Sequence, residues 1–245
     1  MTRYKLTIEY DGSGFVGWQR QDNGLGVQQS LEEAITAFSG ESPRVLGAGR
    51  TDSGVHALAQ ICHFDLIGEQ TTDTVRDALN FHLRSVPAVV LDAAIVDDDF
   101  HSRFSATGRS YTYRITNRRA PLSIEKGRSW WVPVRLDAQA MHVAAQVLVG
   151  KHDFTSFRAT NCQADTPVRT LNSLSVERQG EHILIHVQAR SFLHHQVRNF
   201  AGSLKRVGAG KWSAEDLKAA LDARDRRAGG QTAPADGLYL TGVSY

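Results

Sequence analysis

The 245-residue chain contains only two cysteines, Cys62 and Cys162, and it has no Cys-x-x-Cys motif. A disulfide framework and a zinc site are therefore not expected, and two isolated thiols fit a reducing cytoplasm. Long hydrophobic runs are also missing. The longest, residues 86–91, is far shorter than the ~20 residues of a membrane-spanning helix. The amino terminus lacks an apolar signal segment, so the composition predicts a globular cytoplasmic protein without a membrane partner.

The net charge of the whole chain is only +2, but it is unevenly distributed. Residues 1–100 hold 7 Lys or Arg against 15 Asp or Glu, whereas residues 101–245 hold 21 against 11. Within residues 101–135, eight basic residues accompany a single acid, Glu125, and Tyr and Trp side chains lie among them. Clustered arginines with aromatics favour nucleic-acid binding, although composition alone is equally compatible with a solvated basic face.

Alternating and helical hydrophobic patterns predict an α+β fold. In the first half we expect strand 4–10, helix 27–38 closed by Gly40, strands 45–47 and 60–64, a helix opened by Thr71 or Thr72, and strand 88–96. The second half repeats this order with insertions: strand 109–116, helix 138–148, strands 171–177 and 183–190, helices 195–207 and 214–221, and strand 238–243. The pattern predicts two ferredoxin-like (βαββαβ) subdomains, residues 1–104 and 105–245, whose mainly antiparallel sheets join across a central active-site cleft.

Three patterns that suggest a cofactor or a metal are rejected on physical grounds. Residues 12–17 fit G-x-G-x-x-G, but a polar, glycine-broken stretch follows where a dinucleotide site needs a helix. His182 and His186 lie four apart on a predicted strand, about 13 Å from each other and too far to share an ion. Adjacent His194 and His195, taken as strand residues, point to opposite faces. The chain is therefore expected to use neither a cofactor nor a metal.

The segment 47–57 is richest in chemically active side chains. Its three glycines predict a loop between two strands, with Arg50, Asp52 and His56 at the tip. An aspartate in such a loop is most often a turn former, so the pattern alone does not make Asp52 catalytic.

Several motifs together resemble the tRNA pseudouridine synthase A family. They are Tyr-Asp-Gly-Ser at 10–13, Gly-Trp-Gln-Arg-Gln at 17–21, Gly-Arg-Thr-Asp-Ser-Gly-Val-His-Ala at 49–57, Phe-Ser-Ala-Thr at 104–107, His-Asp-Phe-Thr-Ser-Phe at 152–157, Phe-Leu-His-His-Gln-Val-Arg-Asn at 192–199 and Gly-Leu-Tyr-Leu at 237–240. Two positions depart from the family pattern: Ser53 replaces a common Ala, and Gln196 replaces a common Met.

The resemblance implies an enzyme that isomerises uridine to pseudouridine in the anticodon stem-loop of tRNA, at the family's sites 38, 39 and/or 40. It also implies a homodimer that needs no cofactor. Asp52 is then the catalytic aspartate, and Arg198 is its basic partner. Tyr111 contacts the target uracil, and Arg50 enters the RNA where the uridine is flipped out.

Two alternatives remain open at this point. One is a non-catalytic protein that binds or folds tRNA, and the other is an Asp-dependent nucleoside hydrolase. A core aromatic of its strand is the less favoured interpretation of Tyr111. The sequence also leaves open whether Asp52 attacks C1′ or another atom of the nucleotide.

Overall fold

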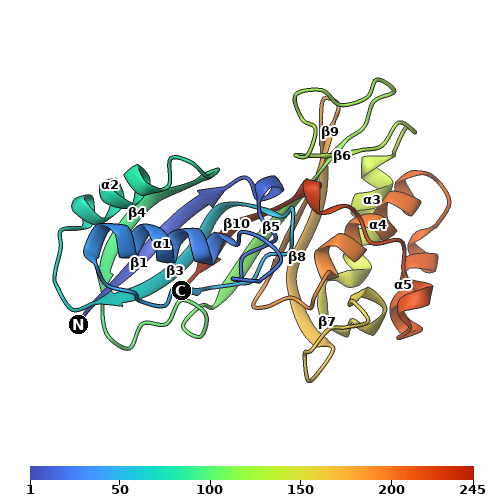
Figure 1. Ribbon diagram of the computed structural model, residues 1–245. Helices are drawn as coiled ribbons and strands as arrows, with labels where there is room; N and C mark the ends of the chain where they lie inside the picture. The colour runs from blue at the N-terminus through green and yellow to red at the C-terminus, as the bar shows by residue number, and fades with distance from the viewer. The chain divides into compact units, whose positions relative to one another are not determined.

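The computed structural model describes residues 1–245, which divide into two compact units (Figure 1). The first unit is Met1–Thr107 with Leu240–Tyr245, and the second is Gly108–Tyr239. The chain therefore leaves the first unit once and returns to it with its last residues. No helix combines the length and the apolar character that crossing a bilayer requires.

Strand β1 lies at the centre of the first unit. It pairs antiparallel with β3 and with β4, and β2 pairs antiparallel with β3, so the order is β4-β1-β3 with β2 and β10 also beside β3. Helices α1 and α2 cover one face of this sheet (Figure 1). The elements are β1 (Thr2–Tyr10), α1 (Val27–Ser39), β2 (Leu46–Gly47), β3 (His56–Leu66), α2 (Thr72–His82), β4 (Ala88–Val96) and most of β10 (Leu238–Ser244).

Hydrophobic patterning explains these elements. Alternate residues of β1, from Tyr4 to Tyr10, are buried, as expected for a strand with one face in the core. Helix α1 ends where Gly40 takes a left-handed conformation at φ 74°. Helix α2 begins after Thr71, whose side chain accepts a hydrogen bond from the Thr74 N–H at 3.2 Å.

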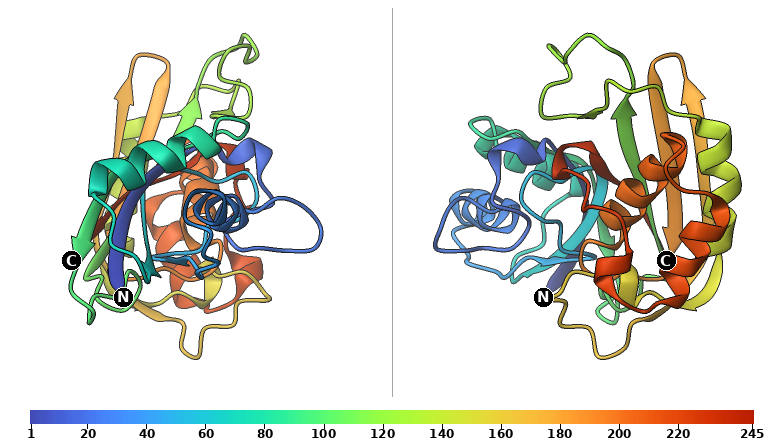
Figure 2. Two further views of the ribbon diagram at one scale, coloured as in Figure 1. Left: turned by 60° about the vertical axis from the view of Figure 1, so that its left-hand side comes forward. Right: turned by 90° about the vertical axis from the view of Figure 1, so that its right-hand side faces the viewer.

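The second unit is built on an antiparallel sheet of order β5-β9-β8-β7, and the short β6 runs parallel to β5. Helices α3, α4 and α5 pack on one face of this sheet (Figure 1, Figure 2). The elements are β5 (Gly108–Thr116), β6 (Trp130–Trp131), α3 (Ala138–Ala145), β7 (Gly150–Asp153), β8 (Val168–Gln179), β9 (His182–Ala189), α4 (Gln196–Gly208) and α5 (Ala214–Asp222).

Three fully buried phenylalanines form the aromatic core beneath α4. The rings of Phe154, Phe157 and Phe200 lie 5.2 to 6.4 Å apart. The buried Asn199 amide donates to the Phe157 carbonyl at 2.8 Å, so no polar group of this contact is left unsatisfied. These contacts fix α4, the helix that carries Arg198.

The structure confirms a mixture of helices and mainly antiparallel strands. Strand 88–96 has the predicted bounds, and the other predicted helices and strands are present with small shifts at their ends. Strand β3 is longer than the predicted 60–64, and β6 and β7 were not predicted. The predicted helix start at His195 is one residue from the observed start of α4 at Gln196, but the treatment of His194 and His195 as strand residues in the metal argument was wrong. They lie in the turn before α4, and their ring centroids are 4.0 Å apart, so the opposite-faces argument does not apply to them.

A buried histidine holds the segment that leaves the first unit. His63 on β3 is 3% exposed, and its Nδ1 lies 2.9 Å from the Ser102 hydroxyl. That hydroxyl donates to the Leu46 carbonyl at 2.6 Å, and the Tyr245 hydroxyl donates to the Ser102 carbonyl at 2.8 Å. Burial, helped by the nearby charges of His101 and Arg3, lowers the pKa of His63 from 6.5 to about 4.

We expect the protein to lose stability as the pH falls from 6.5 towards 4. Because His63 has the lower pKa in the folded state, the unfolded chain takes up the proton first. The contribution of the neutral His63 to the free energy of unfolding is therefore complete above pH 6.5 and is lost as the pH approaches 4. The loss is at most about 3 kcal/mol. Urea unfolding at pH 7 and pH 4.5 measures it. His63→Asn should show a smaller loss, and His82→Asn, at an exposed site, should behave like wild type. An equal loss in all three proteins would assign the effect to other groups.

Candidate active site

The Asp52 loop, residues 48–55, connects β2 to β3 in the first unit and is held by backbone hydrogen bonds. Asp52 and Gly17 form an isolated antiparallel bridge. The Trp18 N–H donates to the Thr51 carbonyl at 3.0 Å, and the Val55 N–H donates to the Asp52 carbonyl at 3.1 Å. The loop therefore lies directly against residues 17 and 18, and backbone contacts hold it there.

The glycines of the G-x-G-x-x-G segment allow this close approach. A Cβ at Gly12 would lie 2.1 Å from the Val55 carbonyl oxygen, and a Cβ at Gly17 would lie 2.8 Å from the Thr51 carbonyl oxygen. Gly17 also has a φ of +118°, which strains any other residue. A short 3₁₀ turn, Gly12–Gly14, follows β1, and α1 begins only at Val27. In this chain the motif packs against the Asp52 loop.

Hydrogen bonds from side chains of β1 and β3 also hold the Asp52 loop. The Tyr10 and Thr51 hydroxyls lie 2.8 Å apart in a buried contact, and the Gln60 amide donates to the Gly49 carbonyl at 2.9 Å. Asp52 itself is half-buried and Arg50 is exposed. A half-buried carboxylate and an exposed guanidinium thus share one loop that hydrogen bonds hold in place, an arrangement suited to preorganised chemistry.

His56 does not lie at the tip of this loop, as the sequence suggested. It begins β3 and is 2% exposed, and its Nδ1 accepts a hydrogen bond from the Gly12 N–H at 3.0 Å. The same nitrogen lies 3.2 Å from the Asp11 carboxylate, which pairs with it only if the ring is protonated. His56 therefore fixes the turn after β1, and its role in the loop is structural.

Tyr111 lies on β5 in the second unit, and the structure distinguishes it from its neighbour Tyr113. Two residues apart on one strand, both point to the same face. Tyr113 is fully buried, and its hydroxyl donates to the Pro234 carbonyl at 2.8 Å. Burial raises the pKa of Tyr113 well above its ordinary value. Tyr111 is only half-buried, and its ring packs edge-on against Phe192 at 5.2 Å. Tyr113 is therefore the core tyrosine of this strand.

Arg198 lies in the first turn of α4 and is held from the side by residues 229–237. Its Nε donates to the Ala233 carbonyl at 2.8 Å, and the Ala233 N–H donates to the Arg198 carbonyl at 3.1 Å. The next carbonyl, that of Pro234, accepts from Tyr113 on β5. One short segment therefore ties the helix that carries Arg198 to the strand that carries Tyr111.

Gln196, one of the two departures from the family pattern, has a local structural role. Its side-chain oxygen accepts a hydrogen bond from the Leu193 N–H at 2.8 Å, at the turn that opens α4. This turn also contains His195, whose φ of 61° is left-handed. The other departure, Ser53, donates from its hydroxyl to the Phe15 carbonyl at 3.2 Å. Both departures add a hydrogen bond to the backbone near a candidate residue.

The structure thus brings the four candidates together in pairs. Arg50 and Asp52 share the loop of the first unit. In the second unit, residues 233–234 connect Arg198 to Tyr113, two residues from Tyr111 on β5. Sequence reasoning missed the 229–237 segment, because it acts through backbone carbonyls. The pair Gly229-Gly230 and Pro234 were the available signals that the backbone is constrained there.

Comparisons with known proteins give one consistent result. A family model described as tRNA pseudouridine synthase matches residues 6–105 and 144–245. The chain is 59% identical over 245 residues to tRNA pseudouridine synthase A of Maricaulis maris, covering 100% of this chain and 98% of the relative. It is 60% identical to the proteins of that name from Mesorhizobium japonicum, over 247 residues, and Rhodospirillum centenum, over 245 residues. In both cases 100% of each chain is covered.

Proposed function

The chain belongs to the tRNA pseudouridine synthase family, and we propose that it isomerises uridine to pseudouridine in the anticodon stem-loop of tRNA, with Asp52 as the catalytic group. The observation that carries the proposal is the rigid loop that presents a half-buried Asp52 in a chain matched along its whole length by enzymes of this name. Isomerisation is also the activity that the family name describes.

The reaction needs a group that can act at the sugar while the base turns. The N1–C1′ bond breaks, the uracil rotates, and a C5–C1′ bond forms, while C5 loses a proton and N1 gains one. A carboxylate can attack the nucleotide covalently or stabilise positive charge at C1′, as in glycoside cleavage. Because substrate and product contain the same atoms at the same oxidation level, the proposed reaction needs no redox cofactor or group donor.

The other three residues have roles that suit their chemistry. Arg198 would keep the Asp52 carboxylate charged, since a neighbouring cation favours the ionised form. Tyr111 would contact the detached uracil with its ring and take part in proton transfer through its hydroxyl. Arg50, exposed on the Asp52 loop, would fill the space that the flipped uridine leaves in the RNA.

This mechanism requires the two halves of the chain to act together. We propose two ferredoxin-like subdomains, residues 1–104 and 105–245, that enclose the reacting uridine. The order β1, α1, β2, β3, α2, β4 and the antiparallel pairing of β1 with β3 and β4 support this for the first. The proposal extends to a homodimer that binds one tRNA with both subunits and acts in the cytoplasm.

The decisive experiment is to incubate the recombinant protein with unmodified tRNA and map pseudouridine along the RNA. Pseudouridine in the anticodon stem-loop is the expected product. A protein that binds tRNA tightly but isomerises no uridine would be the non-catalytic alternative. Release of free uracil, with an abasic site left in the RNA, would identify a hydrolase.

We expect tRNA affinity to fall steeply with salt. Each phosphate contacted by Lys or Arg releases condensed counterions, so about four contacts weaken binding about a hundredfold between 50 and 200 mM salt. Residues 101–245, with 21 basic and 11 acidic side chains, are the expected source of these contacts. Filter binding across this salt range measures the slope. An affinity that barely changes would contradict an RNA interface dominated by phosphate contacts.

A further inference from the structure

The segment between β5 and β6, residues 117–129, is the most one-sidedly charged loop of the second unit, and we call it the basic loop. It contains four cations and one acid: Arg118, Arg119, Lys126, Arg128 and Glu125. It is drawn in green at the top of Figure 1. Apolar packing does not fix its middle part, because Ile124 is 88% exposed.

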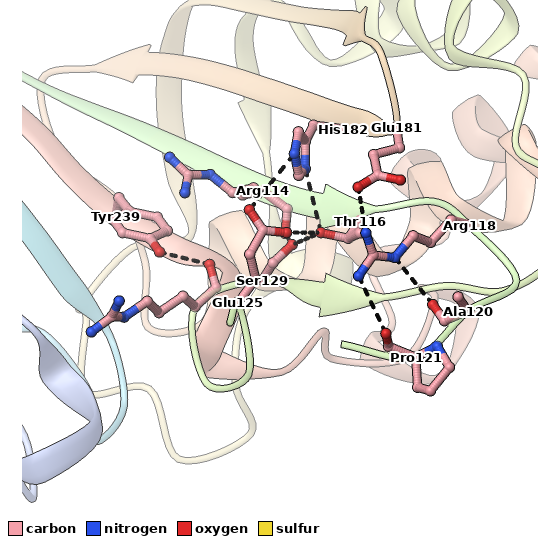
Figure 3. Close-up of polar contacts among 11 residues, drawn as sticks. Arg114, Thr116, Arg118, Ala120, Pro121, Glu125, Ser129, Glu181, His182 and Tyr239 are labelled. Atoms are coloured by element: carbon pink, nitrogen blue, oxygen red, sulfur yellow. Dashed lines mark hydrogen bonds and ion pairs between the residues drawn. The ribbon is translucent and has the colours of Figure 1, made fainter. Parts of the chain in front are cut away.

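The single acid of the loop is directed inward. Glu125 Oε2 accepts a hydrogen bond from the Thr116 hydroxyl at 2.8 Å, and Glu125 Oε1 lies 3.6 Å from His182 Nε2 (Figure 3). Thr116 is fully buried at the end of β5, and its hydroxyl also lies 2.7 Å from that of the buried Ser129. Glu125 therefore provides an acceptor for the buried hydroxyl of Thr116, which also contacts Ser129.

Two further anchors hold the ends of the basic loop. Arg118 pairs with Glu181 at 2.5 Å and donates to the carbonyls of Ala120 and Pro121 at 3.2 Å (Figure 3). At the other end, the Tyr239 hydroxyl donates to the Arg128 carbonyl at 2.6 Å. The backbone of the loop is thus fixed at its start, middle and end by polar contacts.

These contacts use Arg118 and Glu125 internally, while the side chains of Arg119 and Lys126 are exposed. We propose that the basic loop is a phosphate-contacting surface for RNA, and that Glu125 is a positioning residue that holds Arg119 and Lys126 ready for it. The inference rests on the proposed tRNA substrate, since exposed cations on a preordered backbone bind a polyanion without the cost of ordering the loop.

Two substitutions of Glu125 separate positioning from charge. Glu125→Ala and Glu125→Gln both remove one negative charge, which by Coulomb attraction alone would strengthen RNA binding equally. Only Gln keeps an oxygen that can accept the Thr116 hydrogen bond. We expect Glu125→Gln to bind unmodified tRNA as tightly as wild type or slightly more tightly, and Glu125→Ala to bind about three- to tenfold more weakly. The KM of Glu125→Ala should rise, and its kcat should stay within about twofold of the wild-type value. Equal affinity of the two variants would overturn the positioning role.

The surface itself is tested by removing its cations. The double variant Arg119→Ala/Lys126→Ala should lower the slope of log affinity against log salt by about 1.5, because each lost phosphate contact contributes 0.7 to 0.9. The control Arg76→Ala/Arg84→Ala removes the same charge from the α2 region of the first unit and should leave the slope unchanged. An unchanged slope in the basic-loop variant would refute the surface.

Binding is measured without turnover, so this inference and the proposed function can fail separately. Wild-type protein that binds tRNA through the basic loop but forms no pseudouridine would refute the function alone. Wild-type catalysis with an unaltered salt slope in Arg119→Ala/Lys126→Ala would refute the loop alone. The melting temperature of each variant identifies any loss of binding that is caused by unfolding.

Discussion

Asp52→Asn is expected to slow pseudouridine formation by at least about a thousandfold while tRNA binding changes little. Asparagine has nearly the same size as aspartate, but it provides neither a negative charge nor a carboxylate nucleophile. The loop should keep its shape, because Asp52→Asn leaves in place the backbone contacts of Thr51, Asp52 and Val55 and the hydroxyl contacts of Thr51 and Ser53. Single-turnover mapping of pseudouridine in unmodified tRNA measures the rate, and filter binding measures the affinity.

Ser53→Ala is the matched control for this prediction. It changes the adjacent residue of the same loop and removes one hydrogen bond, from the Ser53 hydroxyl to the Phe15 carbonyl. Since alanine is the common family residue at this position, the Ser53→Ala protein should stay within a fewfold of wild-type activity. If Asp52→Asn retained activity comparable to that of Ser53→Ala, the catalytic assignment of Asp52 would be wrong.

Gly202→Ala is expected to destabilise the protein by about 2–3 kcal/mol, although helix propensity alone predicts the opposite. Within α4, alanine would favour the helix by about 1 kcal/mol. However, a Cβ at residue 202 would lie 1.7 Å from the Gln231 carbonyl oxygen, which belongs to a backbone that cannot rotate aside. Overpacking of this kind costs about 1–3 kcal/mol, and displacing residues 229–237 also removes their hydrogen bonds to α4. The packing cost exceeds the propensity gain.

Urea unfolding of wild type and Gly202→Ala measures this free energy directly. Gly68→Ala is the control, because Gly68 is exposed and a Cβ there would meet no atom within 4 Å. It should change stability by less than about 0.5 kcal/mol. The Gly202→Ala protein should also lose activity, because the Ala233 carbonyl that orients Arg198 moves. If Gly202→Ala were more stable than wild type, residues 229–237 would be able to move away from the new Cβ without loss of unfolding free energy.

Much of the fold could be predicted because its signals are local. Thr71 before α2 and Gly40 after α1 are capping residues whose preference arises within one helical turn. Two short strands, β6 with two residues and β7 with four, were not predicted, because so few residues show no periodicity. The equally short β2 was predicted at 45–47. His56 was misplaced, since its position depends on packing against Gly12. Treating His194 and His195 as strand residues was also wrong, because His195 takes a left-handed turn that leads into α4.

The candidate site was less accessible to physical reasoning from the sequence. Nothing in the Gly-rich pattern separates Asp52 from a turn-forming aspartate, and its assignment came from the resemblance between several motifs. Once the fold is known, the packing of Gly12 and Gly17 explains why the loop is rigid. The supports of Arg198 come from the backbone of Ala233, more than thirty residues further along the chain. The charge and the hydrophobic pattern of the sequence do not reveal such a contact, and the nearby glycines and Pro234 indicate only that the backbone is constrained there.

The return of residues 240–245 to the first unit affects the order in which the protein can be completed during synthesis. The Thr107 N–H donates to the Ser244 carbonyl at 2.8 Å, and the Tyr245 ring lies 4.9 Å from that of Phe100. The ribosome makes the Asp52 loop early, yet the unit that contains it lacks these contacts until the residues of β10 have been added. Residues 108–239 must therefore be synthesised before the first unit can gain its last contacts, so a partly made protein cannot present a finished first unit to RNA.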